Sequence, residues 1–152
     1  AESVPERRHL TVLFCDLVDS TTLAGSLDPE DFREVLQVYY QTCATVVQQF
    51  EGYIAQYLGD GVLGYFGYPM AHEDDAQRAV YAGLAILAAL TAPSRQENLP
   101  VGEQLAARLG VHTGLVVVGD LDVGAAHGPL ALGETPHIAA QLQHLAAPFA
   151  LP

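Results

Sequence analysis

The stretch YLGDGVLGYFGYP, from Tyr57 to Pro69, has the pattern of a β-hairpin. Two apolar runs flank the dipeptide Asp60-Gly61, and Asp-Gly is a strong hairpin signal because it accepts the positive φ angles of a tight turn. The pattern predicts strands from Tyr53 to Leu58 and from Val62 to Phe66. It therefore places an acidic side chain at the tip of a hairpin.

A second acidic residue ends an apolar run earlier in the chain, in LTVLFCDLVDSTT, from Leu10 to Thr22. Residues 9–16 are rich in β-branched and aromatic side chains, which predicts a short buried strand that ends at Asp16. Asp16 and Asp60 are then either two unrelated turn residues or two halves of one metal site.

The rest of the chain predicts further helices and strands. Pro29 opens a long amphipathic helix that runs to Phe50, with an apolar stripe of Phe32, Val35, Leu36, Tyr39, Cys43, Val46, Val47 and Phe50. A second helix starts at residues 73–75 and has Ala76, Ala79, Val80, Gly83, Ile86, Leu87 and Leu90 on its apolar face. Residues 104–119 form a strand region with a hairpin around His112-Thr113-Gly114 as one option, and a third helix runs from Glu134 to about Leu145.

This order, β-α-β-β-α-β, predicts an α+β fold with a ferredoxin-like antiparallel sheet and helices on one face. The 152 residues suffice for one domain, 1–152, with its own core. In such a sheet the first and third strands lie side by side at the centre. The hairpin turn at Asp60 can then approach the end of the strand that carries Asp16.

The composition limits the function. The net charge of −12, with only 6 Lys and Arg, argues against nucleic-acid binding and means that a bound polyphosphate needs a cation, backbone amides or a partner chain. Cys15 and Cys43 are isolated and predict buried free thiols of a reducing compartment. We expect a cytoplasmic domain without a membrane span, since the apolar runs are short and no signal-peptide pattern begins the chain.

Two carboxylates that meet at one edge repel each other unless a cation lies between them, and Mg²⁺ suits such a pair because it also binds water and phosphate oxygens. The alternative is that Asp16 and Asp60 each stabilise a turn. In DLVDSTT, a phosphate could rest on the exposed amides at Ser20 and Thr21, or these residues could simply cap a helix.

Four stretches in this order resemble the catalytic domain of class III nucleotidyl cyclases, the adenylyl and guanylyl cyclases, of the bacterial type akin to soluble adenylyl cyclase. They are LTVLFCDLVDSTTLAGSLDPEDF, GYIAQYLGDGVLGYFGYPMAHEDDAQRAVYAGLAI, LGVHTGLVVVG and LGETPHIAAQLQ. The resemblance covers nearly the whole chain, and several ordered motifs are more specific than one.

The resemblance implies a head-to-tail dimer with active sites between the protomers, where ATP becomes cyclic AMP and pyrophosphate. It implies that Asp16 and Asp60, with the Leu17 carbonyl, hold two Mg²⁺ or Mn²⁺ ions that act in two-metal catalysis. It also implies that Ser20 and Thr21 contact the triphosphate.

The chain departs from the family pattern where the opposite protomer contributes to the site. Gln56 stands where the family has a base-recognising Lys, and the second base-reading position falls near Leu130. His137 and Gln141 stand where a helix of the family carries Asn and a catalytic Arg. Gln lacks the charged fork of Arg, so the transition-state half of the site is weakened. The family's last hairpin, which carries a further Lys, does not occur in these 152 residues, because either the sequence stops before it or the domain is shortened.

Two functions remain open. The first is a nucleotidyl cyclase domain that uses ATP or another nucleoside triphosphate and works as a homodimer or beside a complementary cyclase domain. The second is a catalytically weak or inactive cyclase-homology module that binds nucleotide, dimerises and regulates attached domains. The two preserved aspartates favour the first, and Gln56, His137 and Gln141 favour the second.

Overall fold

The computed structural model describes residues 6–92, 105–120 and 129–132. Its elements follow the predicted order, with a short helix and a short strand in addition. They are β1 (Glu6–Leu17), α1 (Ser20–Ser26), α2 (Pro29–Gln49), β2 (Tyr53–Leu58), β3 (Gly61–Phe66), α3 (Asp75–Thr91), β4 (Ala107–Asp120) and β5 (Pro129–Leu132). The third helix predicted from Glu134 lies outside the described residues. None of the described helices has the length and apolar character needed to cross a membrane.

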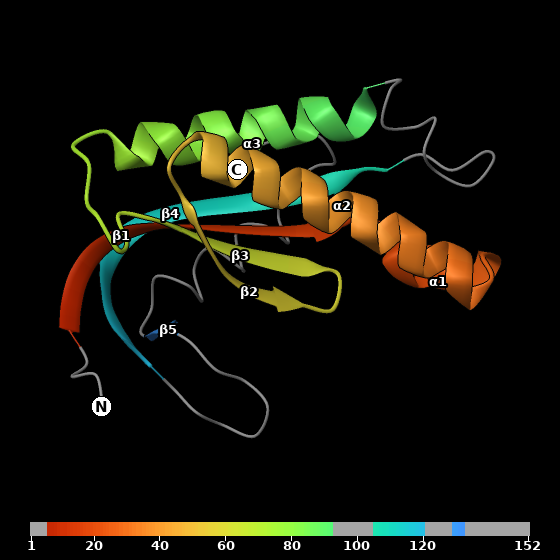
Figure 1. Ribbon diagram of the computed structural model, residues 1–152, viewed down its shortest axis with the longest axis horizontal. Helices are drawn as coiled ribbons and strands as arrows, with labels where there is room; N and C mark the ends of the chain where they lie inside the picture. The colour runs from red at the N-terminus through yellow and green to blue at the C-terminus, as the bar shows by residue number, and fades with distance from the viewer. Residues whose placement is uncertain (1–5, 93–104, 121–128, 133–152) are drawn as a thin grey trace.

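The strands form one sheet in the order β2-β3-β1-β4-β5, and each neighbouring pair is antiparallel. β1 is central, between β3 and β4, so the first and third strands lie side by side as predicted. The helices α2 and α3 pack on one face of this sheet (Figure 1). The predicted α+β fold is therefore confirmed.

The main core lies between the sheet and these two helices. In β1 the side chains of Leu13, Cys15 and Leu17 belong to it, at alternate positions along the strand. The helices contribute their buried residues Val35, Tyr39, Thr42, Cys43, Val46 and Val47 from α2, and Ala79, Ala82, Gly83, Ile86, Leu87 and Leu90 from α3. Cys15 and Cys43 are buried free thiols, as predicted.

The predicted apolar face of α3 was partly wrong. Ala76 and Val80 are exposed, and Ala82 is buried instead. Alanine occurs all around this helix, so its sequence periodicity defines the buried face only loosely.

The opposite face of the sheet carries the alternate side chains. Leu10, Val12, Leu63, Tyr65 and Val116 form a second buried cluster, against which Phe14 packs. Asp16 follows Phe14 by two residues in β1, so it lies on this face, away from the helices.

The hairpin turn differs by one residue from the prediction. Leu58 pairs with Gly61, so the two turn residues are Gly59 and Asp60 rather than Asp60 and Gly61. Gly59 has a φ of +64°, which a glycine adopts without steric strain. Asp60 is still at the tip of the hairpin.

The hairpin considered around residues 112–114 was wrong. β4 is one continuous strand that pairs with β1 from Ala107 to Val118. Thr113 and Gly114 fit the strand because the Thr113 hydroxyl meets the Thr11 hydroxyl at 2.7 Å and Gly114 pairs with Leu10. Glycine weakens the interior of a strand, but here the pairing with β1 continues through it.

Candidate active site

Asp16 and Asp60 come together at one end of the sheet. Asp16 pairs with Gly61 across the β1–β3 ladder, and Gly61 directly follows Asp60. Directly opposed residues of an antiparallel pair have Cα atoms roughly 4.5 to 5.5 Å apart. The two acidic residues, distant in sequence, therefore occupy neighbouring backbone positions.

Arg108 lies on the other side of Asp16. The two residues are directly opposed in the β1–β4 ladder, so their side chains project from the same face of the sheet. The Nε atom of Arg108 is buried and has no hydrogen-bond partner among the described residues. A buried guanidinium nitrogen without a partner is a potential donor to an anion.

Arg108 was not predicted from the sequence as a site residue. The only available signal was a lone Arg within a strand-like run, in a chain with 6 Lys and Arg in all. Its relationship to Asp16 depends on the strand register, which composition does not reveal.

A pocket of about 300 Å³ lies between α1, α2 and the hairpin turn. Its described lining residues are Ser20, Thr21, Ala24, Phe32, Leu36, Gly59 and Asp60. The structure thus brings Ser20 and Thr21 to the same pocket as Asp60, whereas Asp16 is not one of its described lining residues. The capping alternative gains no support here, because the N-cap residue Asp19 makes no side-chain capping hydrogen bond.

The remaining predicted residues are more dispersed. The Leu17 side chain is buried in the main core, so only its backbone is available to a ligand. Gln56 pairs with Leu63 in the β2–β3 ladder and lies on the face away from the helices, separated from β1 by β3. His137 and Gln141 lie outside the described residues.

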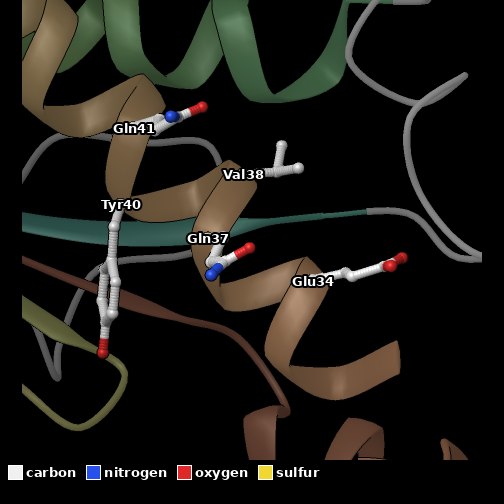
Figure 2. A pocket seen from close by; sticks show the side chains of 5 residues that line it. All are labelled: Glu34, Gln37, Val38, Tyr40 and Gln41. Atoms are coloured by element: carbon white, nitrogen blue, oxygen red, sulfur yellow. The ribbon is translucent and has the colours of Figure 1, made fainter. Parts of the chain in front are cut away.

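Tyr40 is a second residue that was not predicted from the sequence. Its ring contacts that of Tyr57, with centroids 4.6 Å apart. Burial, followed by the negative charge of Asp60, raises the pKa of the Tyr40 hydroxyl. The same side chain lines a second pocket of about 600 Å³ along α2 (Figure 2), together with Glu34, Gln37, Val38 and Gln41.

The donor set fits a hard divalent cation. No group of three or more His, Cys, Asp or Glu side chains that could hold a metal occurs in the described ranges. Two aspartates at neighbouring backbone positions do not make a closed metal cage, but Mg²⁺ binds through one or two carboxylates together with water and phosphate oxygens. The arrangement therefore suits a cation that arrives with a phosphorylated ligand.

Comparison with protein families identifies the relatives of this chain. The family model described as the adenylate and guanylate cyclase catalytic domain matches residues 3–148. Adenylate cyclase 1 of Rhizobium meliloti (strain 1021) is 31% identical over 140 residues, which are 90% of this chain and 21% of the relative. The adenylate cyclase of Anabaena cylindrica is 21% identical over 142 residues, covering 91% of this chain and 27% of the relative. The chain thus spans a small part of both curated relatives.

Solved structures agree. The guanylyl cyclase Cya2 superposes with a TM-score of 0.86 at 30% identity, over 94% of this chain and 73% of the other. The adenylyl cyclase CyaB from P. aeruginosa gives a TM-score of 0.90 at 24% identity, over 98% of this chain and 78% of the other. At that identity, the likeness to CyaB shows the shared fold.

Proposed function

Because the chain belongs to the family of adenylate and guanylate cyclase catalytic domains, we propose that it converts ATP to cyclic AMP and pyrophosphate in a metal-dependent reaction. The observation that carries this proposal is the register that sets Asp16 opposite Gly61, beside Asp60. A protein that only needed the fold would have no use for two acidic groups at one strand end.

In this proposal Asp16 and Asp60, with the Leu17 carbonyl, hold two Mg²⁺ or Mn²⁺ ions. Ions held there would supply Lewis-acid chemistry, lowering the pKa of the ribose 3′-hydroxyl and stabilising negative charge on the pyrophosphate. The protein supplies fixed carboxylates, since β1 is the central strand of the sheet and the β2–β3 turn is short.

The triphosphate is bound by the groups around these carboxylates. Ser20 and Thr21 line the pocket next to Asp60 and donate hydrogen bonds to phosphate oxygens. Arg108 adds a positive charge directly opposite Asp16, and its buried Nε donates to the phosphates. With a net charge of −12, the chain needs such a cationic group beside the bound cations to accept a polyphosphate.

The other half of the site comes from a second protomer or from a complementary cyclase domain. By this proposal Gln56 meets the base, and His137 and Gln141 meet the ribose and the α-phosphate. Two of these three are neutral amides, so the chain alone is expected to be a weak catalyst. ATP is proposed as the substrate because the two curated relatives above are named adenylate cyclases.

The test is an assay of the purified chain with ATP or GTP and Mn²⁺, alone and mixed with a cyclase domain that carries the Lys, Asn and Arg. We expect little cyclic AMP from the chain alone and strong production from the mixture. If only GTP gives a cyclic product, ATP is the wrong substrate and GTP takes its place.

The second candidate, a regulatory module, is favoured by Gln56 in place of the base-recognising Lys. It predicts no product under either condition. Retained binding of Mn²⁺ and nucleotide would then indicate a nucleotide sensor, and absence of both would leave a dimerisation module.

A further inference from the structure

The β2 side of the hairpin that carries Asp60 has little support from the sheet, whereas the β3 side pairs with β1 as far as Gly61. β2 is the edge strand and pairs only with β3 among the described strands. Its ladder is interrupted by a register shift between Ile54 and Gln56. Beyond this bulge, Tyr57 and Leu58 are each 44% exposed. An edge segment with few buried contacts opens more easily than the core of the sheet.

One aromatic contact joins this segment to the core helix. The Tyr40 ring lies 4.6 Å from the Tyr57 ring at an interplanar angle of 51°, a tilted geometry that is favourable for aromatic pairs. Tyr40 is fixed on α2, where the preceding Tyr39 is fully buried and Cys43, three residues further on, belongs to the core. Figure 2 shows the Tyr40 side chain extending away from α2, in a different direction from Glu34 and Val38.

The same side of α2 borders the acidic turn. Leu36, one helical turn before Tyr40, lines the pocket that Asp60 also lines. Tyr57 precedes Asp60 by three residues along the chain. Two successive turns of α2 therefore flank the hairpin end.

We propose that the contact between Tyr40 and Tyr57 clamps the end of the β2–β3 hairpin to α2 and so holds Asp60 in position beside Asp16. Tyr40 is a positioning residue, because it acts through Tyr57 and the turn. The role of Asp60 rests on the proposed function, whereas the clamp itself is a property of the fold. The aromatic ring carries the effect, so phenylalanine at position 40 preserves it.

The clamp is tested by hydrogen exchange of the backbone amides of residues 57–62. Tyr40→Ala is expected to accelerate their exchange by roughly twofold to tenfold, the range that corresponds to the loss of one aromatic pair. Tyr57→Ala produces a similar acceleration, and the double variant adds little to either change because both remove one contact. Tyr40→Phe keeps the wild-type rate.

Two controls separate the clamp from general destabilisation. Tyr81→Ala removes an exposed tyrosine from α3, and Ile86→Val weakens the core under α3. Both are expected to leave the exchange of residues 57–62 unchanged relative to the rest of the sheet. Unchanged exchange in Tyr40→Ala, or fully additive effects in the double variant, would overturn the clamp.

The consequence for the site is measured as Mn²⁺ affinity by calorimetry, in the presence of a non-cyclisable ATP analogue. Tyr40→Ala is expected to weaken Mn²⁺ binding by a similar roughly twofold to tenfold factor, with recovery in Tyr40→Phe. If the wild-type chain binds no Mn²⁺, the proposed function fails. The hydrogen-exchange data still show whether the contact between Tyr40 and Tyr57 holds the hairpin end. If wild type binds Mn²⁺ and Tyr40→Ala binds it equally well, the clamp does not position Asp60.

Discussion

Asp16 of β1 and Arg108 of β4 face each other near one end of the antiparallel β1–β4 ladder. The Arg108 Nε atom is buried and has no hydrogen-bond partner in the part of the chain that is described. An unsatisfied guanidinium nitrogen in a buried position is a costly arrangement for stability alone. A bound anion would supply the hydrogen-bond acceptor that this Arg108 nitrogen lacks.

Replacing Arg108 by Gln should therefore weaken binding of a metal–nucleotide complex. Hydrogen bonds to charged groups contribute about 1.5 to 3 kcal/mol, which corresponds to a loss of roughly tenfold or more in affinity. Fluorescent-nucleotide titration in the presence of Mn²⁺ measures it. Arg33→Gln removes an exposed cation from α2 and is the matched control, with an expected change near zero. Equal losses in both variants would point to net charge rather than to a specific donor.

Asp16→Asn and Asp60→Asn should each abolish metal-dependent nucleotide binding. Residues that only support a metal ligand already change metal affinity by roughly 10- to 100-fold, so loss of a ligand should reach the upper end or beyond. Asn is nearly isosteric with Asp, so the circular dichroism spectrum should not change. A variant that keeps wild-type Mn²⁺ affinity would remove that aspartate from the metal site. Asp28→Asn, at the start of α2, is the control for a lost negative charge.

The neighbourhood of Asp16 and Asp60 was predictable because it depends on topology. Apolar alternation marked the strand before Asp16, and the glycines around Asp60 marked the hairpin. Once the order of elements was known, the first and third strands had to be adjacent. The position of the turn was wrong by one residue, since a two-residue hairpin turn can also take its positive φ at a glycine in the first position, and here Gly59 does so.

The groups around this pair were not predictable. The pairing of Arg108 with Asp16 depends on the register of the long β1–β4 ladder. A sequence pattern predicts which face of the sheet a side chain lies on, but not which residue it faces in the neighbouring strand. Helical periodicity likewise indicated which residues of α2 are buried but gave no reason to select Tyr40, which lies at the edge of the buried stripe. The false hairpin at residues 112–114 arose because Thr-Gly is a turn signal unless a neighbouring strand pairs with it.

A close approach at Gly52 predicts a stability effect. A Cβ atom at this position would lie 2.7 Å from both Phe66 Cε1 and Val47 Cγ1, which are core side chains with little room to move. Gly52→Ala should destabilise the fold by about 1 to 3 kcal/mol, as expected for overpacking. Urea denaturation measures the change.

The matched control is Gly25→Ala, because Gly25 lies in α1 and a Cβ atom added there would meet nothing within 4 Å. Alanine has the higher helix propensity, so this variant should be neutral or stabilising by up to about 1 kcal/mol. If both variants lower stability equally, the loss at position 52 does not come from steric contact.

Tyr39 predicts a specific response to alkaline pH. Its hydroxyl donates a hydrogen bond to Cys15 Sγ at 3.3 Å, and the side chain is fully buried. Burial first, and then the charges of nearby thiolates, raise its pKa well above the ordinary value. The neutral form is thus favoured by the fold. Its stabilising contribution is present below the unfolded-state pKa of about 10 and is lost as the pH rises above that value towards the folded-state pKa.

Tyr39→Phe removes both the hydrogen bond and this titration. At pH 7.5 the variant should be less stable than wild type by about 1 kcal/mol, the usual value of one hydrogen bond. Above pH 10, wild type should lose up to about 1.4 kcal/mol per pH unit relative to the variant, because only wild type must retain a proton on this residue to stay folded. Urea midpoints of both proteins between pH 7.5 and pH 11 measure the difference. Curves that stay parallel over this range would show that Tyr39 does not link folding to alkaline pH.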